Sequence, residues 1–159
     1  MYNEREIKED SKKWSSSDLS DYVKKEGYNL WIDVTSAAST TYSELERLQQ
    51  SFCLDEEAIK AVENGSKKPQ ARMLKEHIFT IFLNLGYRNI RDLDTNAIYF
   101  FLGRGWLITI HSKETDLVDM GKKAFLKKNR RILESSVDAL FYSLLSAIVE
   151  KYEQLLTAV

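Results

Sequence analysis

Residues 135–159 carry the most regular alternation of apolar and polar positions in the chain. From Val137 onward, apolar side chains recur at intervals of about three and four residues, which places them on one face of an α-helix. Ser135 and Asp138 form a pair similar to a capping box at its start. The apolar stripe is still running at Val159, without a stop signal. We therefore expect a long C-terminal helix that continues into further sequence.

Dense apolar runs predict β-strands in the middle of the chain. The predicted strands are residues 28–34, 71–75, 76–85, 96–102 and 106–111. The last two predict a hairpin around Gly103, Arg104 and Gly105. Both strands of this hairpin are apolar on both faces, so a layer of other elements must cover each face.

Helices are predicted before and after these strands. Caps and periodic apolar residues indicate the helices 17–26, 43–52 (capped by Ser43), 55–63 (capped by Asp55) and 116–129. Residues 87–94 are polar and predict a connection between two strands. This order of elements is typical of an α+β fold, and we expect an α/β/α sandwich with a mixed, largely antiparallel sheet between two helix layers.

The composition is that of one soluble domain. The 159 residues have a net charge of −1, which gives the whole chain no attraction to nucleic acid or anionic membrane. Residues 1–16 are polar and predict a flexible segment ahead of a domain at 17–159. No uncharged run approaches the roughly 20 residues that a membrane helix needs. Cys53, the single cysteine, excludes an internal disulfide, and its apolar neighbours predict a small core residue.

The sequence offers no residues for catalysis. His77 and His111 lie at the edges of predicted strands, and neither has a second histidine or a cysteine at ligand spacing. The chain lacks a glycine-rich phosphate loop, a nucleophile elbow and an HExxH motif. We therefore expect a protein that is not an enzyme and has no catalytic residues.

A basic run at residues 121–131 supports an alternative function. It contains Lys122, Lys123, Lys127, Lys128, Arg130 and Arg131. On a helix these side chains can bind the phosphates of nucleic acid or anionic lipid. A solvated face whose cations favour the C-terminal end of a helix explains the same run, and we favour this interpretation, with no nucleic-acid partner.

Aspartates in predicted loops are candidate ligands for a cation. Asp92 and Asp94 precede the predicted hairpin. Mg²⁺ keeps most of its waters and needs only one or two carboxylates, so such a site leaves little trace in a sequence. The residue preferences of turns explain the same acids without any metal ion.

Three stretches together resemble a known family. Residues 31–34 (WIDV), 100–111 (FFLGRGWLITIH) and 138–152 (DALFYSLLSAIVEKY) are similar, in order and spacing, to the cytosolic N-terminal domain of CorA-type magnesium and cobalt channels. Residues 52–69 fit the same pattern, so the resemblance extends from residue 28 to residue 159. It implies an α/β/α domain at the cytoplasmic face of the cell membrane.

The resemblance also implies a regulatory function. The last helix would continue beyond Val159 into a stalk and two membrane helices, in a pentamer of identical subunits. The Gly-Met-Asn pore signature would also lie beyond that residue. In this family, acids of the cytosolic domain bind regulatory Mg²⁺ and hold the channel shut. We therefore expect a domain that senses divalent cations and gates the transport of Mg²⁺ or Co²⁺.

The sensor acids of the family are only partly present. The family often has an acid where Ser146 stands and another near Glu150, and here Glu150 alone keeps a carboxylate. A third acid would fall near residues 88–89, where this chain has Arg and Asn. Asp92 and Asp94 lie close to that position. The candidate metal ligands are therefore Asp92, Asp94 and Glu150, and we expect Mg²⁺ to bind weakly.

Overall fold

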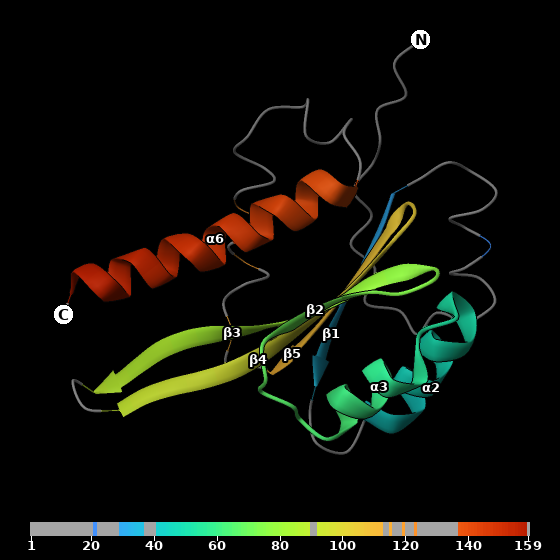
Figure 1. Cartoon of the computed structure of the whole chain (residues 1–159), viewed down its shortest axis with the longest axis horizontal. Helices are drawn as coiled ribbons and strands as arrows, with labels where there is room; N and C mark the ends of the chain where they lie inside the picture. Colours follow the sequence, from blue (N-terminus) through green and yellow to red (C-terminus); the bar gives the residue numbers. More distant parts are fainter. Residues whose placement is uncertain are drawn as a thin grey trace, which may run out of the picture.

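The computed structural model describes residues 21, 29–36, 41–89, 92–112, 115, 119, 123 and 137–158. Its strands are β1 Leu30–Ser36, β2 Gln70–Met73, β3 His77–Asn89, β4 Asp92–Gly103 and β5 Trp106–Ser112. Its helices are α2 Thr41–Phe52, α3 Glu56–Glu63 and α6 Val137–Thr157 (Figure 1). The predictions of a flexible segment at 1–16 and of helices at 17–26 and 116–129 concern residues that lie, wholly or mostly, outside these ranges.

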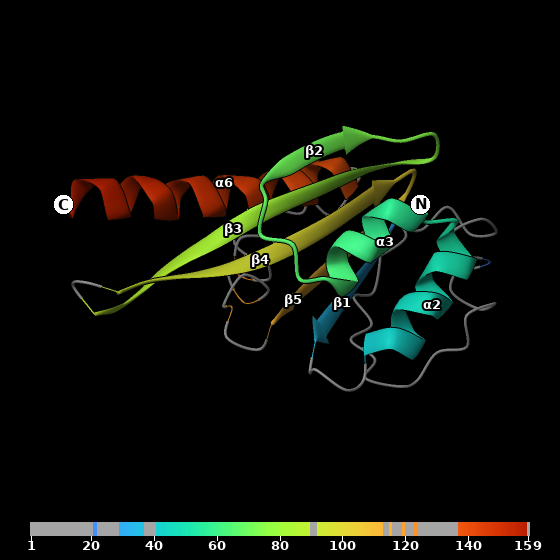
Figure 2. The same ribbon diagram turned by 60° about the horizontal axis from the view of Figure 1, so that its bottom comes forward.

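The five strands form one mixed sheet in the order β1-β5-β4-β3-β2. β1 is parallel to β5, with Asp33 opposite Thr109, and the other three pairs are antiparallel. Figure 2 shows β1 and β2 at the two edges. The predicted hairpin is confirmed, because Gly103 pairs with Trp106 across the turn between β4 and β5.

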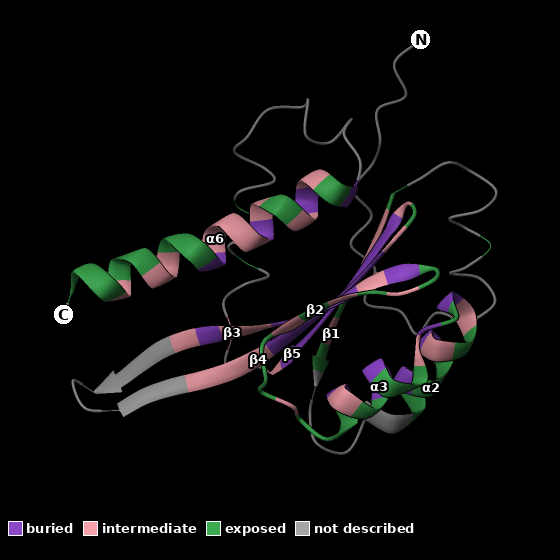
Figure 3. Cartoon of the chain, in the orientation of Figure 1, coloured by how far each residue is buried: buried purple, intermediate pink, exposed green. Residues whose placement is uncertain are grey.

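Helices cover both faces of the sheet, as the two-sided apolar strands predict. Alternate residues of β4 point to opposite faces, so Tyr99 and Phe101 belong to one core cluster while Ile98 and Phe100 belong to another. α2 and α3 complete the first cluster, and α6 completes the second (Figures 1 and 3). The predicted α/β/α sandwich is therefore present.

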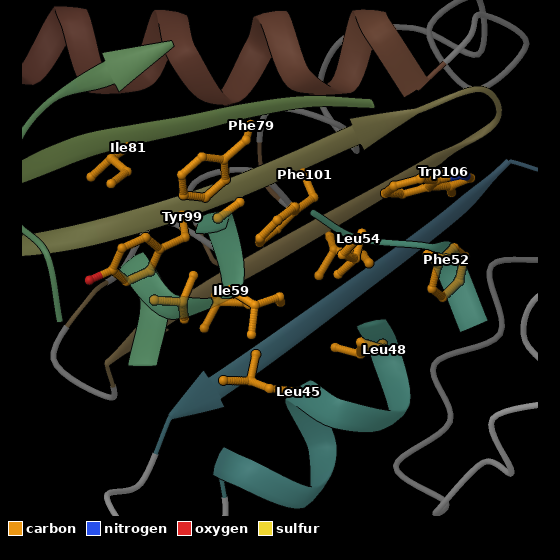
Figure 4. Close-up of a cluster of buried hydrophobic side chains, with 14 residues drawn as sticks. Leu45, Leu48, Phe52, Leu54, Ile59, Phe79, Ile81, Tyr99, Phe101 and Trp106 are labelled. Atoms are coloured by element: carbon orange, nitrogen blue, oxygen red, sulfur yellow. The ribbon is translucent and has the colours of Figure 1, made fainter. Parts of the chain in front are cut away.

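The first cluster is rich in aromatic rings (Figure 4). The ring centroids of Phe79 and Phe101 lie 4.8 Å apart, and those of Phe52 and Trp106 lie 4.9 Å apart. The predicted cap of α3 is confirmed, because the Asp55 carboxylate accepts a hydrogen bond from the N–H of Ala58 at 2.9 Å. This cap holds α3 where its buried face meets the sheet.

The second cluster attaches α6 to the sheet. The 21 residues of α6 give a helix about 32 Å long at about 1.5 Å per residue. Leu140, Leu144 and Ile148 are buried against the sheet, and the rings of Phe141 and Phe100 meet edge-on at 5.4 Å. The apolar periodicity therefore predicts the helix correctly, and its buried face as far as Ile148, whereas Val149 and Leu156 of the same apolar stripe are exposed.

The prediction that residues 87–94 form a polar connection is wrong. β3 continues to Asn89 and β4 begins at Asp92, with Gly86 opposite Asp94 in the ladder. Pairing between backbone groups extends this hairpin without requiring apolar side chains, so polarity alone does not mark the end of the strands. Similarly, α2 begins at Thr41, so Ser43 lies inside its first turn instead of capping it.

The prediction that Cys53 is a core residue is also wrong. Cys53 is exposed, although its neighbours Phe52 and Leu54 are both buried. Its φ of 51° is the left-handed conformation that commonly follows the last turn of a helix. The chain reverses there, and the N–H of Leu54 donates to the carbonyl of Gln49 at 3.2 Å. This reversal turns the thiol away from the core.

Candidate functional site

The predicted cation ligands belong to two elements, α6 and β4. Glu150 is exposed in the C-terminal half of α6. Asp92 and Asp94 lie at the start of β4, in the part of the β3–β4 hairpin that extends under the C-terminal half of α6 (Figure 1). The side chains of both aspartates lie outside the described residues, so a shared site stays a prediction. Within the described part of the chain, no three His, Cys, Asp or Glu side chains are grouped to hold a metal ion.

Polar contacts fasten α6 to β3 immediately after Glu150. The Lys151 ammonium donates to Oδ1 of buried Asn84 at 3.1 Å, and Asn84 Nδ2 donates to Thr115 Oγ1 at 3.0 Å. The Tyr152 hydroxyl donates to the carbonyl of Leu83. The position of this part of α6 is therefore set by specific hydrogen bonds as well as by apolar packing.

A second polar cluster joins β1 to β5 on the same face of the sheet. His111 Nε2 lies 2.9 Å from Oδ1 and 3.1 Å from Oδ2 of Asp33. The hydroxyl of Thr109 donates to Asp33 Oδ1 at 2.5 Å and accepts a hydrogen bond from the indole N–H of Trp31 at 3.1 Å. The Asp33 side chain is 24% exposed and that of His111 4%. The parallel register of β1 and β5 brings these side chains together.

The contacts of His111 favour its charged form. Its Nδ1 lies 2.7 Å from the carbonyl oxygen of Ser112, and its Nε2 faces the Asp33 carboxylate. Both partners are acceptors, so both ring nitrogens must carry a proton for both hydrogen bonds to form. Burial lowers the pKa of His111, but the hydrogen bonds to Asp33 and Ser112 outweigh burial and raise this pKa above its ordinary value.

His77 has the opposite environment. It is 5% exposed, and its ring lies 5.6 Å from that of Phe101 and 6.1 Å from that of Trp106. Neither ring nitrogen has a hydrogen-bond partner among the described residues. Burial lowers the pKa of His77, against the weaker raising effect of Asp55 and Glu76. Both histidines occupy strand ends, as predicted, but the sequence did not indicate their burial or the pairing of His111 with Asp33.

The family of the chain follows from a match of its sequence to a family model. The family model described as CorA-like Mg²⁺ transporter protein matches residues 26–159. The chain therefore belongs to the CorA-like Mg²⁺ transporter family. It is similar to the cobalt/magnesium transport protein CorA of Thermotoga maritima, with 23% identity over 128 residues, covering 79% of this chain and 36% of that protein. The chain spans about a third of the length of this curated relative.

Solved structures share the fold of this chain. The soluble domain of CorA from Methanocaldococcus jannaschii matches with a TM-score of 0.61 and 20% identity, covering 80% of this chain and 50% of that one. The complete CorA magnesium transporter of the same organism matches with a TM-score of 0.63 and 21% identity, covering 84% of this chain and 41% of that one. The ZntB cytoplasmic domain of Vibrio parahaemolyticus matches with a TM-score of 0.61 and 13% identity, covering 80% of this chain and 50% of that one. At these identities the likeness shows the fold alone.

Among the helices that the structure describes, none has both the length and the apolar character needed to cross a bilayer.

Proposed function

We propose that this chain is the cytosolic regulatory domain of a CorA-like transporter for divalent cations such as Mg²⁺ or Co²⁺. The observation that carries the proposal is the family match over residues 26–159, which coincides with the α/β/α fold. The parent protein would be a membrane-embedded pentamer of identical subunits, with this domain at the cytoplasmic face. Its function would be to sense cations and gate their transport, without catalysing a reaction.

The surface of α6 fits a place within a larger helical assembly. Tyr142, Val149 and Leu156 are 73%, 49% and 77% exposed, and they follow one another at seven-residue intervals along one side of the helix. This side is distinct from the buried face formed by Leu144 and Ile148. Apolar side chains repeated at this spacing are typical of a helix that packs against another helix. In the proposed transporter, a further helix of the parent protein would cover this stripe.

Sensing would act through the acids near the contact of α6 with β3. Glu150 presents its carboxylate to solvent, one residue before Lys151 anchors the helix to Asn84. A cation that joins Glu150 to Asp92 or Asp94, in one subunit or across two, would favour one arrangement of α6 relative to the hairpin. Binding energy that differs between two arrangements shifts the population toward one of them, which is the physical requirement for gating.

The experiment is a flux assay on the transporter that contains this chain, reconstituted in liposomes. Mg²⁺ or Co²⁺ influx is measured with a fluorescent indicator while the Mg²⁺ concentration on the side of this domain is varied. We expect cation flux, and we expect E150Q to need more Mg²⁺ for half-inhibition. E46Q on α2 is the matched control, because Glu46 is also exposed but lies on the opposite helix layer. Absence of flux would reject the transporter function, whereas flux with equal inhibition in both variants would reject sensing by Glu150.

The alternative function rests on residues that the structure mostly does not describe. Of the basic run 121–131, only Lys123 lies within the described residues, where it is helical and exposed. Binding of nucleic acid or anionic lipid through this run therefore stays a prediction. Duplex DNA binding that weakens steeply with salt would support it.

A further inference from the structure

A series of hydrogen bonds crosses the α6 face of the sheet from its β1 edge to α6. On the β1 side it contains Trp31, Thr109, Asp33 and His111. It continues through the carbonyl of Ser112, Thr115, Asn84 and Lys151. The link between the two halves is the Ser112 carbonyl oxygen, which accepts from His111 Nδ1 at 2.7 Å and from the N–H of Thr115 at 3.4 Å.

We infer that the protonation state of His111 is coupled to the docking of α6 on β3, through Ser112, Thr115 and Asn84. The coupled elements lie far apart in the sequence: His111 is in β5, and Lys151 is in the C-terminal half of α6. The Asn84 side chain joins them, because its amide donates to Thr115 while its carbonyl accepts from Lys151. This coupling is a property of the domain itself and does not depend on the transporter function.

The direction of the coupling follows from the two acceptors around the His111 ring. When the imidazolium loses one proton, the remaining proton stays on Nε2, because the Asp33 carboxylate is a stronger acceptor than a peptide carbonyl. The lone pair of Nδ1 then faces the Ser112 oxygen at 2.7 Å, where a hydrogen bond is replaced by repulsion. Ser112 must move, and the oxygen that it offers to Thr115 moves with it.

The surroundings of His111 leave Asp33 as the charged group that acts on it in the described part of the chain. On the same face of the sheet, β4 presents the apolar side chains of Ile98 and Phe100, and α6 presents Leu144 and Ile148. The charge of α6 that belongs to the network is the Lys151 ammonium, which reaches it through Asn84. A pH response of α6 above about pH 6.5, and below the titration of Tyr152, whose pKa burial raises above its ordinary value of about 10, is therefore expected to report on His111.

The first test is an NMR titration of the 159-residue chain. The ring signals of His111 give its midpoint, and the Tyr152 ring and Lys151 amide report on α6. We expect the α6 signals to shift with the His111 midpoint and to stop doing so in H111Q, whose amide N–H still donates to Asp33 but does not titrate. H77Q is the matched control and must leave the α6 titration in place. Signals of α6 that ignore the His111 midpoint would overturn the inference.

The second test uses the reciprocity of coupled equilibria. If protonated His111 favours docked α6, then weakening the docking must lower the midpoint of His111. N84L removes the bridging amide from a buried position without changing any charge. K151M must also lower the midpoint, which removal of a positive charge by electrostatics alone would not do. K60M, at an exposed position of α3, is the control and should leave the midpoint unchanged. An unchanged midpoint in N84L, or a raised one in K151M, would refute the coupling.

A third variant keeps the tests decisive if H111Q does not fold. D33N removes the negative charge that stabilises the imidazolium, so the His111 midpoint falls. The titration of the Tyr152 and Lys151 signals must then move to the same lower pH. If it stays at the original pH, another group causes the response of α6 and the inference fails.

Discussion

Replacing Gly103 with alanine is expected to destabilise the domain through a clash with one side chain. A Cβ atom at Gly103 would lie 2.0 Å from Cε2, 2.2 Å from Cζ2 and 2.5 Å from Nε1 of Trp106. Carbon atoms in contact are normally about 3.5–4 Å apart, so the indole must move by about 1.5–2 Å. The ring is buried, and it packs against Phe52 at 4.9 Å and His77 at 6.1 Å. It therefore cannot move without disturbing the first core cluster.

The expected loss of stability lies between two limits. If the indole shifts within the core, the cost is that of overpacking, about 1–3 kcal/mol. If the ring is expelled, the cost approaches the roughly 3–5 kcal/mol of removing a large buried aromatic side chain. Urea unfolding followed by circular dichroism measures this free energy. Gly65 is the control, because its φ of +61° is left-handed but a Cβ there meets no atom within 4 Å. G65A should cost only the backbone strain, about 1–2 kcal/mol.

A double-mutant cycle separates the clash from other effects of G103A. In a W106L background the indole is absent, so the added methyl group has space and G103A should cost much less than in the original chain. An equal cost in both backgrounds would refute the reasoning, because backbone strain or altered strand propensity would then explain the whole loss. The reasoning would also be refuted if G103A folded as stably as the original chain.

Three further predictions test the core, the thiol and the buried histidine. L144A, at a fully buried position of α6, should lower the free energy of unfolding by about 2–5 kcal/mol, whereas L156A, at an exposed position, should change it by less than about 0.5 kcal/mol in the same thermal melt. Cys53 should react with a thiol reagent in the native protein as fast as in urea, and protection would contradict its exposure. Burial lowers the pKa of His77, so stability should fall as pH drops through about 6.5 toward that pKa. H77F should reduce this loss, and an unchanged acid limb would show that His77 does not cause it.

The layers of the fold could be predicted because each depends on a local apolar pattern. Residues 98–102 are apolar at every position, so both faces of β4 needed covering, and all of these residues are buried. The stripe from Val137 to Ile148 indicated α6 and its buried face. The extent of the β3–β4 hairpin could not be predicted, because polar residues can pair through their backbone groups alone.

The polar cluster on β1 and β5 could not be predicted from the sequence pattern of either strand alone. Asp33 and His111 are 78 residues apart, and they meet only because β1 lies parallel to β5 in one particular register. A shift of one residue would turn Asp33 to the other face of the sheet. The available signal was that Asp33 lies between the apolar residues Ile32 and Val34 of one strand, and that Thr109 and His111 alternate with apolar residues in another. Such isolated polar residues must find partners when their strands are buried.

The two histidines show why residue type alone does not reveal a site. Both lie at strand ends and both are about equally buried, at 5% and 4% exposure. His77 lies among aromatic rings, which disfavour its charged form. His111 lies between two hydrogen-bond acceptors, and its ring can donate to both of them only when it is charged. The pKa of His111 is raised by folding, so the free energy of unfolding falls as the pH rises above about 6.5. The pKa of His77 is lowered by folding, so the free energy of unfolding falls as the pH drops below about 6.5. Their effects therefore oppose each other, and only the contacts of His111 continue through Ser112 to α6.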